Sequence, residues 1–131
     1  MDLNEDDVYT FMNEWMHSTL ARPYIRRLFS YINIDDEIME LTYELSNPVD
    51  NNTDEDFVVE LVSSGMVIEW LEPQVKSVLN ISQMFGGKEQ KFYAQANHLS
   101  ELKSMLKDCK SELRKMIRDR GYISNSYING E

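Results

Sequence analysis

Residues that form covalent cross-links and metal sites are scarce in this chain. Its 131 residues include one cysteine, Cys109, and two histidines, His17 and His98. A single cysteine excludes an internal disulfide and also a zinc site built from paired cysteines. The two histidines are not spaced as a ligand pair, so we expect neither a metal nor a cofactor.

Long apolar runs are also missing. No stretch approaches the roughly 18 apolar residues that a membrane span needs. The first residues, MDLNEDDVYTF, are acidic where a secretion signal is basic and then apolar. We therefore expect a protein that is made in the cytoplasm and has no membrane partner. The length suits a single domain, which we place at residues 1–120, followed by a C-terminal tail at residues 121–131.

Signatures of catalysis are equally scarce. The acidic segment at residues 50–56 matches a calcium-binding loop only in part, because Glu55 stands where glycine is needed and Leu61 where glutamate is needed. The GGK sequence at residues 86–88 lacks the spacing and the following serine or threonine of a phosphate-binding loop. Cys109 lies between leucines of a helical pattern, which favours a buried side chain over a nucleophile. We predict that the protein is not an enzyme and has no catalytic residues.

Charge is abundant, but it is unevenly distributed. The chain has 23 acidic and 13 basic residues, a net charge of −10. Residues 1–60 hold 15 acids and 3 bases, whereas residues 61–131 hold 8 acids and 10 bases. This acidity argues against a simple duplex-binding module. An acidic front and a mildly basic back suit head-to-tail contacts between copies, although solubility alone explains the charge equally well.

The clearest pattern that is present is an apolar seam within residues 92–122. Apolar residues follow each other there at spacings of three and four, with polar or charged residues around them: Leu99, Leu102, Leu106, Cys109, Leu113 and Met116. The spacing predicts a helix of roughly six turns that packs on the chain, on copies of itself, or on both.

Basic residues on this last helix have two interpretations. Cations toward a helix C-terminus favour the helix dipole and solubility. They could also form a face for an acidic partner, and the acidic half of a neighbouring copy is the nearest candidate. The residues of this hypothetical inter-subunit face are Lys103, Lys107, Lys110, Arg114 and Arg118.

Helical spacing extends over much of the first half. It predicts a helix from Asn4 or Glu5, a second from Pro23 through Ile32, and a short one at residues 38–45. Residues 47–56 are polar and predict a loop. Thr53 is expected to cap the following helix, with Asp56 in the position of the capping-box glutamate.

Residues 57–85 are apolar on more than one face, which predicts the central and most buried helix. Their β-branched valines leave a strand at residues 57–62 as an alternative. Pro73 should kink this helix or end it near Glu72, and the glycine pair at residues 86–87 should close it.

These patterns predict an all-α fold. We expect a small bundle of four to five helices with a long C-terminal helix and an extended C-terminal tail. The residues expected in its core are Leu61, Ile68, Trp70, Leu71, Leu102, Leu106, Cys109, Leu113 and Met116.

The order of features resembles the small head–tail connector proteins, or neck adaptors, of tailed bacteriophages. The similarity covers residues 54–122 and depends most on MVIEWLEP at residues 66–73 and on FYAQANHLSELKSMLKDCKSELRKMIRDRGY at residues 92–122. The family resemblance implies an all-α virion subunit that assembles into a closed ring, twelve-fold in this family, beneath the portal. Such a ring extends the DNA channel and joins the capsid to the tail.

The same resemblance implies three kinds of partner. These are the portal protein, neighbouring copies of the chain, and the next neck or tail-completion protein, while DNA passes through without sequence-specific binding. The C-terminal tail would dock on the portal, and it carries Tyr122, Ile123, Tyr127 and Ile128. Two alternatives remain open. One is a small phage-encoded helical regulatory or anti-host binding protein, and the other is a nucleic-acid-binding module built on the basic last helix.

Overall fold

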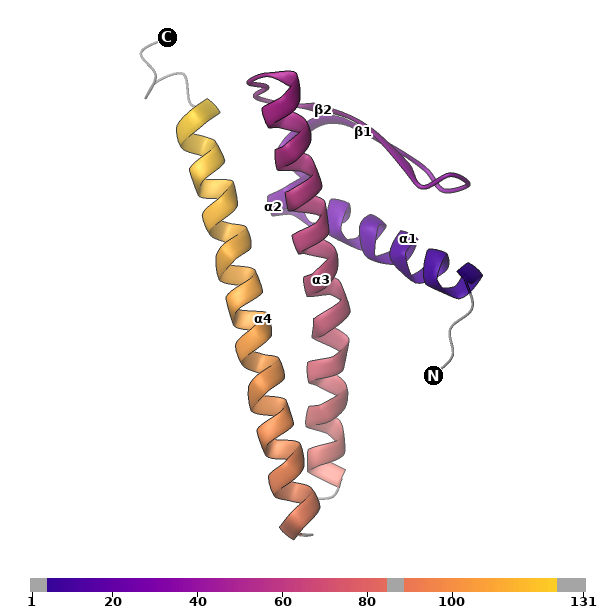
Figure 1. Cartoon of the computed structure of the whole chain (residues 1–131), viewed down its shortest axis with the longest axis vertical. Helices are drawn as coiled ribbons and strands as arrows, with labels where there is room; N and C mark the ends of the chain where they lie inside the picture. The colour runs from indigo at the N-terminus through magenta and orange to yellow at the C-terminus, as the bar shows by residue number, and fades with distance from the viewer. Residues whose placement is uncertain (1–4, 85–88, 125–131) are drawn as a thin grey trace.

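Helices form most of the molecule. The computed structural model describes residues 5–84 and 89–124, with side chains for residues 5–78 and 97–122. In chain order the elements are α1 (Glu5–Ala21), α2 (Pro23–Arg26), β1 (Phe29–Asp35), β2 (Glu40–Leu45), α3 (Asn51–Met84) and α4 (Glu89–Ser124). The two long helices α3 and α4 run side by side in opposite directions, and α1 crosses α3 on the side away from α4 (Figure 1).

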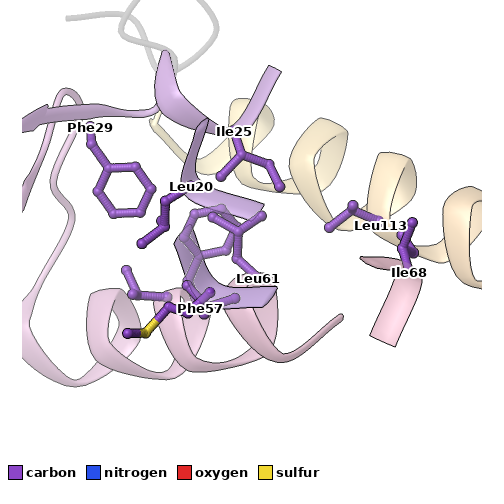
Figure 2. Packing of buried hydrophobic residues seen from close by; sticks show 10 residues of the cluster. Leu20, Ile25, Phe29, Phe57, Leu61, Ile68 and Leu113 are labelled. Carbon is purple, nitrogen blue, oxygen red and sulfur yellow. The ribbon is translucent and has the colours of Figure 1, made fainter. Parts of the chain in front are cut away.

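The core lies where all of these elements meet around the first half of α3. Leu20 of α1, Ile25 of α2 and Phe29 of β1 point toward Leu61 of α3, and Leu113 of α4 completes the cluster (Figure 2). Each of these side chains is almost fully buried. Burial of one such aliphatic or aromatic side chain contributes about 1.5–3 kcal/mol, so this junction fixes how the two long helices and α1 are arranged.

The predicted helices at residues 23–32 and 38–45 are wrong in large part. The helix that begins at Pro23 ends at Arg26, and an antiparallel hairpin follows, in which β1 pairs with β2. Burial alternates with a period of two along β2, and along β1 after the register shift between Phe29 and Tyr31. One face of the hairpin packs on the core while the other faces solvent. The fold is therefore mostly helical with a small two-stranded sheet, and not all-α.

The start of α3 also differs from the prediction. The helix begins at Asn51, inside the expected loop, and Asp50 is its cap in place of Thr53: the Asp50 carboxylate accepts hydrogen bonds from the Thr53 backbone N–H (2.8 Å) and hydroxyl (2.9 Å). Aspartate is as good a cap as threonine or better, and it lies one turn earlier. The alternative of a strand at residues 57–62 is wrong, since they are helical throughout.

Two expectations for the long helices can be compared directly with their ends. Helix α3 continues through Pro73 to Met84, so it does not end near Glu72. The glycine pair that was expected to close it lies outside the described residues. Helix α4 includes Gly121 and ends at Ser124, within the segment expected to form a tail.

The predicted core residues are buried to different degrees. Leu61, Ile68, Leu71, Leu102 and Leu113 are buried, and Leu106, Cys109 and Met116 are partly buried against the same core. Trp70 was expected there but is 45% exposed. Ile68 and Leu71 occupy the inward face of α3 and are one turn apart, so the residue between them at position 70 is rotated away from that face.

Candidate partner-binding groove

A groove with a volume of about 820 Å³ lies between the α1–α2 junction and the second half of α4. We call it the basic groove. Its lining residues are Arg22, Tyr24, Arg27, Glu72, Lys110, Leu113, Arg114, Ile117, Arg118 and Gly121. Five cationic side chains and one carboxylate therefore surround the apolar side chains of Leu113 and Ile117.

The α1–α2 junction positions three of these side chains. Arg22 has an extended backbone (φ −63°, ψ 128°) because Pro23 follows it and begins α2. Ile25 is fully buried and anchors the short helix on the core. With Ile25 pointing inward, Tyr24 and Arg27 face outward, toward the groove.

A chain of ion pairs connects the groove wall to both long helices. Arg22 binds Glu69 through two hydrogen bonds of 2.7 and 3.1 Å and lies 3.7 Å from Glu72. Glu72 in turn forms an ion pair with Lys110 of α4, whose Nζ lies 3.0 Å from Glu72 Oε1. The hydrogen bond to Glu69 is the main cause that raises the pKa of Arg22 above its ordinary value. These contacts order the groove wall, although pairs this exposed contribute little stability each.

The structure brings together only part of the predicted inter-subunit face. Lys110, Arg114 and Arg118 line the basic groove. Lys103 and Lys107 lie nearer the start of α4, where they line a separate depression with Leu99. Arg22 and Arg27 belong to the groove but were not predicted as site residues. Their signal in the sequence was three arginines clustered around Pro23, at positions 22, 26 and 27.

An acidic surface lies on the opposite side of α3. We call α1 together with the β1–β2 hairpin the acidic prong: these elements contain nine aspartates and glutamates and no lysine or arginine. Both project away from α3 on the side opposite α4 (Figure 1). A cleft of about 800 Å³ separates α1 from the hairpin tip, and acidic residues 6, 14, 36 and 37 line it.

The Asp36 side chain holds the hairpin tip on α1. His17 Nε2 and Asp36 Oδ1 are 2.6 Å apart, and both side chains are about half exposed. The hydrogen bonds from His17 and then from Asn13 lower the pKa of the Asp36 carboxyl. Ile38 at the tip is 64% exposed, and Tyr9 on α1 is 52% exposed, so the acidic prong presents apolar groups among its carboxylates.

A buried ion pair that the sequence did not reveal joins the start of α3 to the end of α4. Arg120 donates to Asp54 at 2.5 Å and to the Asn47 carbonyl at 3.1 Å, and its guanidinium lies 4.9 Å from the centre of the Phe57 ring. Asp54 also accepts from the Val49 backbone N–H. Sixty-six positions separate Asp54 from Arg120 in the sequence, and no local spacing links them.

The residues predicted to dock on the portal lie at the end of the described chain. Tyr122 is on the last turn of α4 and is 56% exposed. Ile123 is helical, and Tyr127 and Ile128 lie outside the described residues.

Residues 5–84 and 89–124 contain neither a cluster of metal ligands nor a membrane-spanning helix. No group of three or more histidine, cysteine or acidic side chains there could hold a metal ion. No helix in that part combines the length and the apolar character needed to cross a bilayer. At residues 50–56, the Asp50 carboxylate accepts from Thr53 and Asp54 pairs with Arg120.

Comparisons of the chain with protein-family models, with curated proteins and with solved structures return no match. The resemblance to phage connector proteins therefore depends on the sequence features alone.

Proposed function

We propose that the protein is a head–tail connector of a tailed bacteriophage, a structural subunit that forms a ring under the portal and joins the capsid to the tail. The observation that carries this proposal is the placement of the basic groove and the acidic prong on opposite sides of α3. The proposal includes no catalytic role and no cofactor.

Opposite charge on opposite sides favours head-to-tail association. A contact between two different patches of one chain is heterologous, and it closes into a ring when the rotation per subunit divides the circle. Complementary potentials also speed encounter and select the register of the contact. The family resemblance suggests twelve subunits in such a ring.

The remaining partners follow from the same resemblance. In the proposed assembly the end of the chain docks on the portal protein, with Tyr122 and Ile123 at the end of α4 and Tyr127 and Ile128 after it in the sequence. Tyrosine provides a large contact area at a low entropic cost. The opposite rim receives the next neck or tail-completion protein. The excess of carboxylates lets DNA slide through the channel without sequence-specific binding.

Co-sedimentation with portal-containing particles tests this function. Purified protein is mixed with tail-less capsids that carry a portal and with capsids assembled without one. We expect saturable binding to the first particles only, and ring-shaped density at the portal vertex by electron microscopy. Equal binding to both particles, or to neither, would rule out the connector function.

Truncation separates the tail from the helices. Removing residues 125–131 leaves every described element intact, so the far-ultraviolet circular dichroism spectrum and the melting temperature should stay close to those of the full chain. We expect the attachment to portal-bearing capsids to be lost. If the truncated chain joins the particles at full occupancy, the docking surface lies on the helices instead.

A second candidate is a small phage-encoded regulatory or anti-host protein. The acidic prong favours it, because nine carboxylates beside exposed apolar side chains also suit a basic host protein. In this case the protein would stay a monomer or dimer and would ignore portal-bearing particles, so the same sedimentation experiment distinguishes the two functions.

A further inference from the structure

We propose that the tip of the acidic prong, residues 35–38, seats in the basic groove of a neighbouring copy. The inference rests on the proposed function, because it names the two surfaces through which neighbours in the ring meet. The occupant of the groove is thus a second copy of this chain, and the contact is heterologous.

The groove offers cationic groups around an apolar floor. Arg27 and Arg114 are exposed and form no ion pair with the described residues. Arg118 is 64% exposed and lies 3.9 Å from Asp119, at the outer limit of an ion pair. Leu113 and Ile117 form the floor. A partner that brings carboxylates flanking an apolar side chain would satisfy both parts of this surface.

The prong tip has this composition. Asp35, Asp36 and Glu37 precede Ile38, which is among the most exposed apolar side chains described. Its backbone is ordered, because the Asp35 carboxylate accepts from the Glu37 backbone N–H at 3.1 Å and Met39 adopts a left-handed conformation (φ 51°) that closes the turn. An ordered tip loses little conformational entropy on binding.

Geometry excludes the groove of the same chain as the partner. The hairpin projects from one side of α3, whereas α4 lies on the other (Figure 1). The second half of α4 supplies much of the lining of the groove. DNA is a weaker candidate for the groove. Most of the surface around it belongs to a chain of net charge −10, and affinity for phosphates requires a concentrated positive potential.

Two charge-reversal variants, measured separately and then mixed, test the pairing of tip and groove. Arg114→Glu in the groove and Glu37→Lys at the tip should each weaken association between copies at least tenfold, measured by sedimentation of concentrated protein and by occupancy on portal-bearing particles. An equimolar mixture of the two variants should recover association, because the reversed groove of one variant meets the reversed tip of the other. Lys115→Glu, on the same helix but outside the groove, is the matched control and should associate like the parent.

Cysteine cross-linking tests the contact at residue level. In a Cys109→Ala background, Ile38→Cys places a thiol at the tip and Gly121→Cys places one at the groove, where a side chain has open space. Oxidation should link copies through this pair. The pair Ile38→Cys with Ser104→Cys, which lies on α4 outside the groove, is the control and should not cross-link.

The outcomes separate this inference from the proposed function. Binding of the parent to portal-bearing particles without the 38–121 cross-link, or without rescue in the mixture, overturns the tip-in-groove contact and leaves the connector function standing. A specific cross-link in a protein that ignores portal-bearing particles keeps the contact and overturns the connector function. If Arg114→Glu instead abolishes retention of DNA while the cross-link is absent, the groove binds phosphates and the inference is wrong.

Discussion

At the scale of single residues, α3 and α1 approach each other closely where Gly65 meets Thr19. A Cβ atom built on Gly65 would lie 2.2 Å from Thr19 Cγ2, and Thr19 is fully buried. A side chain at position 65 would displace this buried threonine, so the close packing favours glycine here. The sequence alone shows a glycine inside a helical pattern, which signals a close contact without naming the partner.

Gly65→Ala should therefore destabilise the fold. Alanine gains about 1 kcal/mol of helix propensity over glycine, but the clash should outweigh it, since overpacking costs about 1–3 kcal/mol. Chemical denaturation measures the difference. Adding Thr19→Ser, which removes the clashing methyl group, should restore part of the loss. Gly121→Ala in α4 is the control, since its methyl group meets open space, and it should be neutral or stabilising. Equal losses of stability in the two alanine variants would contradict the steric argument.

The buried pair of Asp54 and Arg120 allows a second prediction. These residues are only 9% and 6% exposed, and removing one partner of a buried pair typically costs about 3–5 kcal/mol because the other charge is left uncompensated. Asp54→Asn should lower the free energy of unfolding by an amount of this order. The exposed pair of Arg118 and Asp119 supplies the control, and Asp119→Asn should change stability by less than about 1 kcal/mol. Similar losses of unfolding free energy in Asp54→Asn and Asp119→Asn would show that the buried pair stabilises the fold no more than an exposed pair does.

At the scale of elements, the long helices were predictable and the hairpin was not. The apolar seam of α4 repeats at spacings of three and four over many turns, and a pattern of that length indicates a helix. In contrast, the helical spacing in residues 25–32 comes from its first part, where Leu28 N–H bonds to the Ile25 carbonyl at the end of α2. The strand β1 begins directly after it, at Phe29. The alternation of Leu41, Tyr43 and Leu45 was a strand signal with a period of two. No Asn-Gly or Asp-Gly turn marks the hairpin, since Met39 takes the left-handed position itself.

The cap of α3 makes part of the stability depend on pH. Hydrogen bonds from Thr53 lower the pKa of the Asp50 carboxyl in the folded protein. A lowered pKa means that the cap contributes stability above the unfolded value, about 3.9, and loses it as the pH falls through the lower folded value. Asp50→Asn removes this titration. We expect the variant to differ most from the parent near neutral pH and to converge with it at acidic pH, as followed by urea denaturation. A difference that stays constant down to the acidic limit would show that Asp50 does not stabilise α3 through its charge.

At the scale of the whole molecule, the sequence predicted a division of charge but not its geometry. Counting residues gave an acidic front and a basic back. It could not show that α1 and the hairpin project from one side of α3 while α4 covers the other. That arrangement depends on one core shared by Leu20, Leu61 and Leu113, which lie far apart in the sequence. The same limit explains why two lysines predicted for the inter-subunit face lie outside the groove while Arg22 and Arg27 lie within it.

Salt should therefore act on assembly and on folding in different ways. Between about 0.1 M and 1 M salt the screening length falls from about 10 Å to about 3 Å, so association through the basic groove and the acidic prong should weaken strongly, in concentrated solution and on portal-bearing particles alike. The fold depends on an apolar core and on the buried pair of Asp54 and Arg120, which salt screens much less. Its melting temperature should change little over this range, or rise as repulsion within the acidic prong is screened.

Sedimentation and melting measured in parallel across the salt range test this expectation. The truncated chain lacking residues 125–131 is the reference for assembly without portal docking. Association that stays constant across the range would mean that copies meet through apolar surface, and the charge division would then serve solubility alone.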